Sequence, residues 1–301
     1  MMGKWNVECT LCIPSKGEWT EKMQNVSLDS WQHAVLPTLR AHAFNGSSVH
    51  GVTLLAYFFW DDDRIETKFY TVECAFLCAY KSWGIMPSVL VVNRETLTIQ
   101  RFCESYGIRL QVDASLTGGV PTMNLDCIKN LHSRFDTDYV VIIQSDGMPV
   151  NAGLEKFLGK YDYVGAPWPG HCHWKDWFPY PKYGVGNGGF CLRSKRICEQ
   201  AAQAYNAFWR HLPYNWLVGD DVFYCKTMPF FSRYWRKTFR FPTVAEAIGF
   251  SIEAIPPGVE IKCQPLGFHS AYGFLQYVKR FGIPFEEVFN PAKAEDTKIG
   301  D

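Results

Sequence analysis

The run Tyr139–Gly147 limits the possible folds more than any other part of the sequence. It reads Tyr-Val-Val-Ile-Ile-Gln-Ser-Asp-Gly, an apolar stretch with several β-branched residues that ends in a polar turn. An uninterrupted apolar run of this length predicts a strand buried on both faces. Open α/β sheets bind ligands at the carboxyl ends of their strands, so Asp146 is a candidate site residue.

Strand and helix signals alternate along the chain before this run. Apolar stretches predict strands over 52–60, 88–92 and 109–112, and helices are predicted over 66–83, 94–106 and 121–134. This alternation predicts an α/β protein whose mixed central sheet is flanked by helices, with the 139–143 strand near its centre. No repeat or linker interrupts the sequence. We therefore expect one domain over residues 51–301 and an N-terminal extension, residues 1–50, of unclear role packed on it.

Charge and cysteine content exclude several classes of protein. Lys plus Arg and Asp plus Glu number 30 each in 301 residues, so no overall positive field favours a nucleic-acid partner. A local basic group at Arg233, Arg236, Lys237 and Arg240 is interpreted as a solvated helix face. Eleven scattered cysteines with no repeated Cys-X-X-Cys pair indicate neither a disulfide framework nor a zinc ribbon. Without a signal peptide or a membrane span in the sequence, we expect a cytoplasmic protein.

An aromatic and proline-rich segment occupies residues 161–183. It includes Trp168, Trp174, Trp177 and Phe178. This density predicts an ordered surface loop that can stack on a ring-shaped ligand, and a purely structural cluster is an equally good interpretation.

Four short motifs carry most of the chemistry. They are Gln144-Ser145-Asp146, Gly186-Asn187-Gly188-Gly189, Asp220-Asp221 and Gly267-Phe268-His269. Their order and spacing resemble the nucleotide-sugar glycosyltransferases of the GT-A fold. The resemblance is strongest to a bacterial and viral glycosyltransferase-like family distantly similar to the β-1,4-galactosyltransferases. It runs from about residue 52 to 273 and is densest after Gln144.

The resemblance implies a divalent metal site. In GT-A enzymes an Asp-X-Asp motif ends a strand, and its last carboxylate binds Mn²⁺ or Mg²⁺ against the donor diphosphate. Here Gln144 replaces the first acid, and its amide can still hydrogen-bond a ribose hydroxyl. Asp146 and His269 are the implied metal ligands, and an octahedral hard cation would complete its shell with phosphate oxygens and water.

The pair Asp220-Asp221 resembles the acids that supply the catalytic base of inverting enzymes of this type. Such a base takes the proton of the acceptor hydroxyl as its oxygen attacks the anomeric carbon. Both acids are candidates, with a slight preference for Asp220. The other acid can orient sugar hydroxyls or cap the helix that begins at Val222.

The remaining candidates concern the donor and the acceptor. Gln144, Ser145, Asn124 and Arg94 are expected on the donor side. The turn of Gly186, Asn187, Gly188 and Gly189, together with Trp168, is expected to shape the sugar and acceptor pocket. A simple tight hairpin turn explains the glycines equally well.

We therefore expect a metal-assisted, inverting glycosyltransferase, a hexosyl- or pentosyltransferase of polysaccharide biosynthesis. Its donor is a nucleoside-diphosphate sugar, with UDP-sugars favoured. The acceptor is a glycan or another hydroxyl-bearing molecule, and a nucleic acid is open but not favoured. The alternative, motivated by Gln144, is a catalytically inactive carbohydrate-binding or scaffold protein on the same fold. A metal-dependent hydrolase is disfavoured because no second metal cluster accompanies Asp146.

Overall fold

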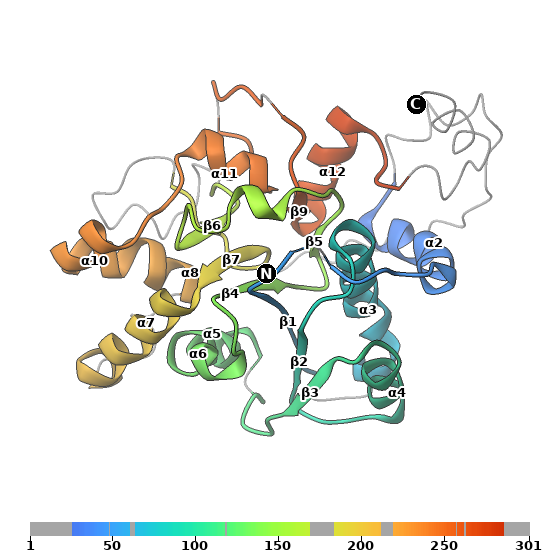
Figure 1. Cartoon of the computed structure of the whole chain (residues 1–301), viewed down its shortest axis with the longest axis horizontal. Coiled ribbons are helices and arrows are strands. Elements are labelled where there is room, and N and C mark those ends of the chain that lie inside the picture. The colour runs from blue at the N-terminus through green and yellow to red at the C-terminus, as the bar shows by residue number, and fades with distance from the viewer. Residues whose placement is uncertain are drawn as a thin grey trace, which may run out of the picture.

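A six-stranded mixed sheet forms the centre of the protein, with helices on both of its faces (Figure 1). The structure, a computed structural model, describes residues 26–47, 49–60, 64–117, 119–168, 184–211, 219–256, 258–261 and 263–285. The strands of this sheet are β1 (Val52–Phe58), β2 (Ser88–Val92), β3 (Arg109–Val112), β4 (Tyr139–Ile143), β6 (Tyr163–Gly165) and β7 (Cys191–Ser194). Their order is β3-β2-β1-β4-β7-β6. The first four lie parallel, and β7 runs antiparallel to both of its neighbours.

The central strand β4 is buried on both faces, as its apolar run predicts. Val141 and Ile143 belong to one hydrophobic core, together with side chains of α3 (Arg64–Trp83) and α4 (Leu97–Tyr106). Val140 and Ile142 belong to a second core on the opposite face, with side chains of the helices α5 (Val120–Lys129) and α7 (Lys195–Ala207). Alternate residues of a strand point to opposite faces, so one short apolar run contributes to both cores. The predicted α/β class with a mixed sheet between helices is confirmed.

A second, three-stranded sheet lies at the end of β4. It contains β5 (Gly147–Pro149), β8 (Ser251–Ile252) and β9 (Gly267–His269), in the order β5-β9-β8. Because β5 follows β4 after three residues, this small sheet brings the C-terminal part of the chain to the carboxyl end of the central strand.

The other helices are short. They are α6 (Leu131–Arg134), η2 (Leu154–Lys156), η4 (Trp209–His211), α8 (Asp220–Val222), η6 (Phe223–Thr227), α9 (Met228–Phe231), α10 (Arg233–Thr238), α11 (Val244–Phe250) and α12 (Ser270–Phe281). The single helix expected over 121–134 is divided at Asn130 into α5 and α6. The backbone φ of Asn130 is −122°, which is not helical. None of the helices in the described residues combines the length and apolar character that a membrane crossing needs.

Helix α2 (Leu28–Ala41) precedes the first strand. Its cap is Ser27, whose side chain accepts a hydrogen bond from the backbone N–H of Ser30. Trp31 packs against the rings of Phe268 and Phe274 at centroid distances of 6.1 and 5.4 Å. The buried Gln32 donates a hydrogen bond of 2.6 Å from Nε2 to the carbonyl oxygen of Ser145. This helix therefore contacts the two segments that carry Asp146 and His269.

Candidate functional site

Asp146 and His269 lie side by side, although 123 positions separate them in the sequence. In the antiparallel pair β5 and β9, Gly147 lies opposite His269. The backbone N–H of Ser270 donates to the carbonyl oxygen of Asp146 at 2.7 Å. As a result, Nε2 of His269 lies 3.7 Å from Oδ1 of Asp146. The structure thus brings the two implied metal ligands together.

Glu253 orients the imidazole of His269, and sequence reasoning did not find this residue. Its Oε1 lies 3.3 Å from Nδ1 of His269, and its Oε2 accepts a hydrogen bond of 2.8 Å from the Asn187 amide. Burial of the imidazole opposes its charge, but the hydrogen bond with Glu253 and the Asp146 carboxylate together raise the pKa of His269. Occupation of Nδ1 by a carboxylate leaves Nε2 facing Asp146, the arrangement typical of metal-binding histidines.

The donor atoms of this pair suit one hard divalent cation. Two ligands on a single Mg²⁺ lie within about 4.2 Å of each other, because each bond is about 2.1 Å long. The Nε2 to Oδ1 separation of 3.7 Å satisfies that limit. Within the described residues, no group of three or more His, Cys, Asp or Glu side chains could hold a metal ion. From the described residues, a cation here would therefore have two ligands, leaving positions for phosphate oxygens and water.

The glycine turn lies against both the His269 side and the acid pair. A Cβ added to Gly189 would lie 2.0 Å from Nε2 of His269 and 2.8 Å from Oε1 of Gln144. A Cβ added to Gly188 would lie 3.3 Å from Oδ1 of Asp220. These glycines are thus required for close approach, and the turn joins the two predicted parts of the site.

Asp220 is held in a buried ion pair. Its carboxylate accepts a hydrogen bond from the guanidinium of Arg193, which is fully buried. The guanidinium lies over the rings of Tyr163 and Tyr224, 5.0 and 4.6 Å from their centroids. A buried carboxylate in such a pair is poorly suited to take a proton from a substrate.

Asp221 has a different environment, although it is the next residue. Its Oδ1 accepts from the backbone N–H of Val222 at 2.8 Å, and its Oδ2 accepts from Nε1 of Trp168 at 3.2 Å. Burial and the adjacent charge of Asp220 raise the pKa of Asp221 to about 7. Asp221 can therefore exchange a proton near neutral pH.

A cavity of about 470 Å³ lies at the carboxyl ends of β1 and β4. Its lining includes Gln144 and Ser145 from the predicted set, and also Trp60, Arg64 and Lys68. Arg64 lies over the Trp60 ring at 4.4 Å from its centroid. Arg94 and Asn124, predicted as donor-side contacts, are not among the residues that line this cavity.

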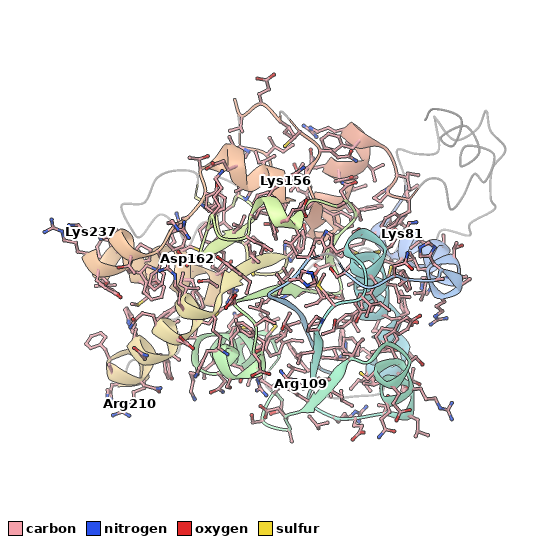
Figure 2. The ribbon with its side chains drawn as sticks, in the orientation of Figure 1. Lys81, Arg109, Lys156, Asp162, Arg210 and Lys237 are labelled. Atoms are coloured by element: carbon pink, nitrogen blue, oxygen red, sulfur yellow. The ribbon has the colours of Figure 1, made fainter. Side chains whose placement is uncertain are left out.

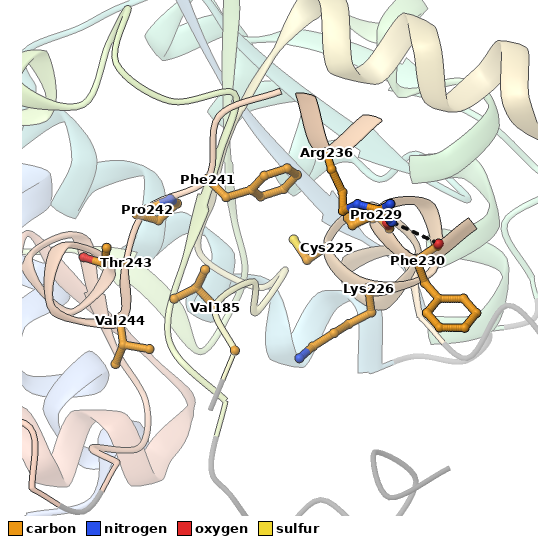
Figure 3. Close-up of a pocket in the computed structure, with 11 residues that line it drawn as sticks. Val185, Cys225, Lys226, Pro229, Phe230, Arg236, Phe241, Pro242, Thr243 and Val244 are labelled. Atoms are coloured by element: carbon orange, nitrogen blue, oxygen red, sulfur yellow. Dashed lines mark hydrogen bonds between the residues drawn. The ribbon is translucent and has the colours of Figure 1, made fainter. Parts of the chain in front are cut away.

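A larger cavity of about 570 Å³ contains none of the predicted site residues (Figure 3). It lies between the η6–α9 segment and residues 241–244. In its wall, Arg236 donates a hydrogen bond of 3.1 Å to the carbonyl oxygen of Phe230. We assign ligand binding to the smaller cavity, because ligands of open α/β sheets bind at the carboxyl ends of the strands.

Three predicted pocket residues have roles other than those expected. The Asn187 amide is occupied at both ends, by Glu253 and by the backbone N–H of Gly189. The Trp168 ring is buried and donates to Asp221, so it is no open stacking surface. A Cβ at Gly186 would lie 2.6 Å from Sγ of Cys225, so this glycine serves close packing. The first part of the predicted aromatic loop is not a surface loop, because Tyr163–Gly165 form the buried strand β6 paired with β7. Residues 169–183 of that loop lie outside the described residues, as does the acidic triplet 61–63.

The fold and the site together define an α/β protein with a polar site at the carboxyl edge of a mixed sheet. Residues 116–269 match the family model described as "Protein of unknown function (DUF5672)", which spans half of the chain. The chain belongs to this family. A search of curated protein sequences found no match.

Several solved structures similar to this chain are glycosyltransferases. A mannosyltransferase from Pyrobaculum calidifontis, in complex with GDP-Man and Mn²⁺, is 11% identical with a TM-score of 0.34; the match covers 61% of this chain and 55% of that one. The glycosyltransferase GlyE of Streptococcus pneumoniae is 11% identical with a TM-score of 0.43, covering 81% and 64%. A glycosyltransferase involved in glycosylation of the major capsid of PBCV-1 is 14% identical with a TM-score of 0.36, covering 81% and 98%. Similarity at this level does not by itself define an activity for this chain.

Proposed function

We propose that the protein is a metal-dependent glycosyltransferase that uses a nucleoside-diphosphate sugar. The observation that carries the proposal is the position of the Gly188-Gly189 turn. Gly189 lies against His269, which is beside Asp146, and the preceding Gly188 lies against Asp220 and Asp221. A metal-anchored leaving group and a proton acceptor on either side of one turn are the two parts that glycosyl transfer needs.

The donor is expected to occupy the 470 Å³ cavity at the ends of β1 and β4. The aromatic rings of Tyr57 and Trp60 suit a nucleobase, and the cationic side chains of Arg64 and Lys68 suit a diphosphate. Gln144 supplies an amide for ribose hydroxyls. UDP-sugars are our first choice of donor, and a GDP-sugar is the next.

Asp146 and His269 would hold Mn²⁺ or Mg²⁺, and Glu253 would keep the imidazole in place through Nδ1. The bound cation would neutralise the charge that develops on the departing diphosphate. Asp221, rather than Asp220, is our proposed base, because its pKa of about 7 lies near the operating pH and no cation pairs with its carboxylate in the described residues. Asp221 would accept the proton of the acceptor hydroxyl as its oxygen attacks the anomeric carbon. A single displacement of this kind inverts the anomeric configuration.

The acceptor in this proposal is a glycan or another hydroxyl-bearing molecule, as in polysaccharide synthesis. We further propose that residues 51–301 form the transferase domain and that residues 1–50 pack on it.

The test is a panel of UDP-, GDP-, TDP- and CMP-sugars with and without Mn²⁺, read first as thermal unfolding. A donor at 100 times its Kd stabilises the folded chain by about 2.7 kcal/mol, so the correct donor should raise the unfolding midpoint only with the metal present. Release of the nucleoside diphosphate is then measured for the donor that binds. Asp146→Ala should abolish both responses.

Asp136→Ala is the matched control, because its side chain is 83% exposed and lies away from the site. It should leave both responses unchanged. Full turnover by Asp146→Ala would refute the metal assignment. Glycan binding without donor release in the unaltered protein would instead favour the carbohydrate-binding alternative.

A further inference from the structure

A group of exposed aromatic side chains lies where the end of α7 meets α9 and α10. Phe208, Phe231 and Tyr234 are 60%, 61% and 60% exposed. Ring contacts connect Phe208 and Phe231 across the two segments, because Trp209 lies 5.5 Å from Phe208 and 5.4 Å from Phe231, between ring centroids. Large aromatic side chains gathered in this way mark an interaction surface.

The same surface is strongly cationic. Arg210, Arg233 and Lys237 are exposed, and in the described part of the chain none of them pairs with a carboxylate. Figure 2 shows Arg210 and Lys237 at the same end of the molecule. From residue 200 to 241 the sequence contains only two acids, Asp220 and Asp221, and these belong to the site described above. The positive charge is therefore local, in a chain whose net charge is zero.

We propose that this aromatic–cationic patch, formed by Phe208, Arg210, Phe231, Arg233, Tyr234 and Lys237, docks the protein on a membrane surface rich in anionic phospholipid. Aromatic rings favour the boundary between lipid headgroups and acyl chains, and arginine and lysine are attracted to anionic headgroups. Transfer of each exposed ring from water into a bilayer is favourable. A purely electrostatic contact with a phosphate backbone does not need exposed aromatic rings. That combination favours a bilayer over a duplex nucleic acid as the partner.

The patch is connected to the candidate site through the backbone. Helix α8 starts at Asp220 and continues through η6 into α9, which ends at Phe231. A docked protein would therefore hold its acid pair on the helical segment that contacts the membrane. This arrangement suits an acceptor presented at a lipid surface. The docking itself needs no turnover, so it can be tested whether or not the proposed transfer reaction occurs.

The test is co-sedimentation of the full chain with vesicles of phosphatidylcholine alone or of equal parts phosphatidylcholine and phosphatidylglycerol. Binding is expected only with the anionic vesicles, and it should weaken as salt rises. Arg233→Glu with Lys237→Glu should weaken binding by about 30-fold or more, since each basic residue near an anionic surface contributes about fivefold. Phe231→Ser with Tyr234→Ser should weaken it by about tenfold or more.

The control pair lies on α12, where Tyr272→Ser with Lys279→Glu removes an exposed ring and an exposed cation outside the patch. This variant should bind as the unaltered chain does. Equal binding to both vesicle types, or equal losses in the control and patch variants, would overturn the proposal. So would salt-dependent binding of duplex DNA through the patch in place of vesicles. Thermal unfolding of each variant establishes that a loss of binding is not a loss of fold.

Discussion

Replacing Gly189 with alanine is the sharpest test of how the site is assembled. The added methyl group would lie 2.0 Å from Nε2 and 2.2 Å from Cδ2 of His269. Carbon contacts are most favourable at about 3.5 Å, so the imidazole would have to move by about 1.5 Å. Gln144 also lies close, at 2.8 Å, but the end of its flexible side chain can rotate away.

Two costs follow from this displacement. Forcing a methyl group into a packed position costs about 1–3 kcal/mol, and losing the hydrogen bond between His269 and Glu253 costs up to about 1.5 kcal/mol more. We expect the free energy of unfolding to fall by about 2–4 kcal/mol. A misplacement of about 1 Å near reacting groups can lower turnover about 100-fold, so activity should fall by at least that factor.

The assay combines denaturant unfolding with Mn²⁺-dependent release of the nucleoside diphosphate. Gly46→Ala is the matched control, because a Cβ there has no atom within 4 Å and its backbone φ lies outside the left-handed region. The double variant Gly189→Ala with His269→Ala completes the experiment. Once the imidazole is absent, adding the methyl group should cost about 0.5–3 kcal/mol less than it does in the unaltered chain, which is the interaction energy of residues in contact.

Wild-type stability and turnover in Gly189→Ala would refute this account of the turn. If Gly189→Ala lowers the free energy of unfolding equally in the unaltered chain and in His269→Ala, the strain does not arise from contact with the imidazole.

Three further outcomes follow from the acid pair and its neighbours. Asp220→Asn should destabilise the fold by about 3–5 kcal/mol in urea unfolding, because it leaves the buried charge of Arg193 without its partner. Asp221→Asn should abolish turnover. In the unaltered chain, the free energy of unfolding should fall as the pH rises from about 4 to about 7, because folded Asp221, with a pKa of about 7, retains a proton that the unfolded chain releases. Asp221→Asn should remove this fall. Glu253→Gln should weaken Mn²⁺ binding by His269 about 10- to 100-fold in calorimetric titration, with little change in the far-ultraviolet circular dichroism.

Local sequence patterns were sufficient to predict the four parallel strands of the central sheet, but not the edge strand β6. The run before Gln144 is apolar at every position, and only a strand covered on both faces buries such a run completely. The carboxyl end of this predicted strand indicated Asp146 as a candidate site residue, and no contact with a distant residue was needed for that inference.

Partners far apart in the sequence could not be predicted in this way. Glu253 follows a two-residue strand, and its role appears only when β8 pairs with β9 and sets it beside His269. Arg193 ends a predicted strand, and nothing nearby in the sequence indicates that Asp220 neutralises it. Asn187 was expected to contact a sugar because its amide is versatile. The structure instead uses both ends of that amide for internal hydrogen bonds.

The contacts of α2 have a consequence for how the protein is made. The hydrogen bond from Nε1 of Trp31 to the carbonyl oxygen of Pro284 spans 253 positions. During synthesis, α2 therefore leaves the ribosome long before these partners, and it completes its packing only when nearly the whole described chain is available. Gln32, on the same helix, supports the turn that carries Asp146. Assembly of the site is thus expected to be among the last events of folding, and a chain interrupted before residue 284 would leave Trp31 without this partner.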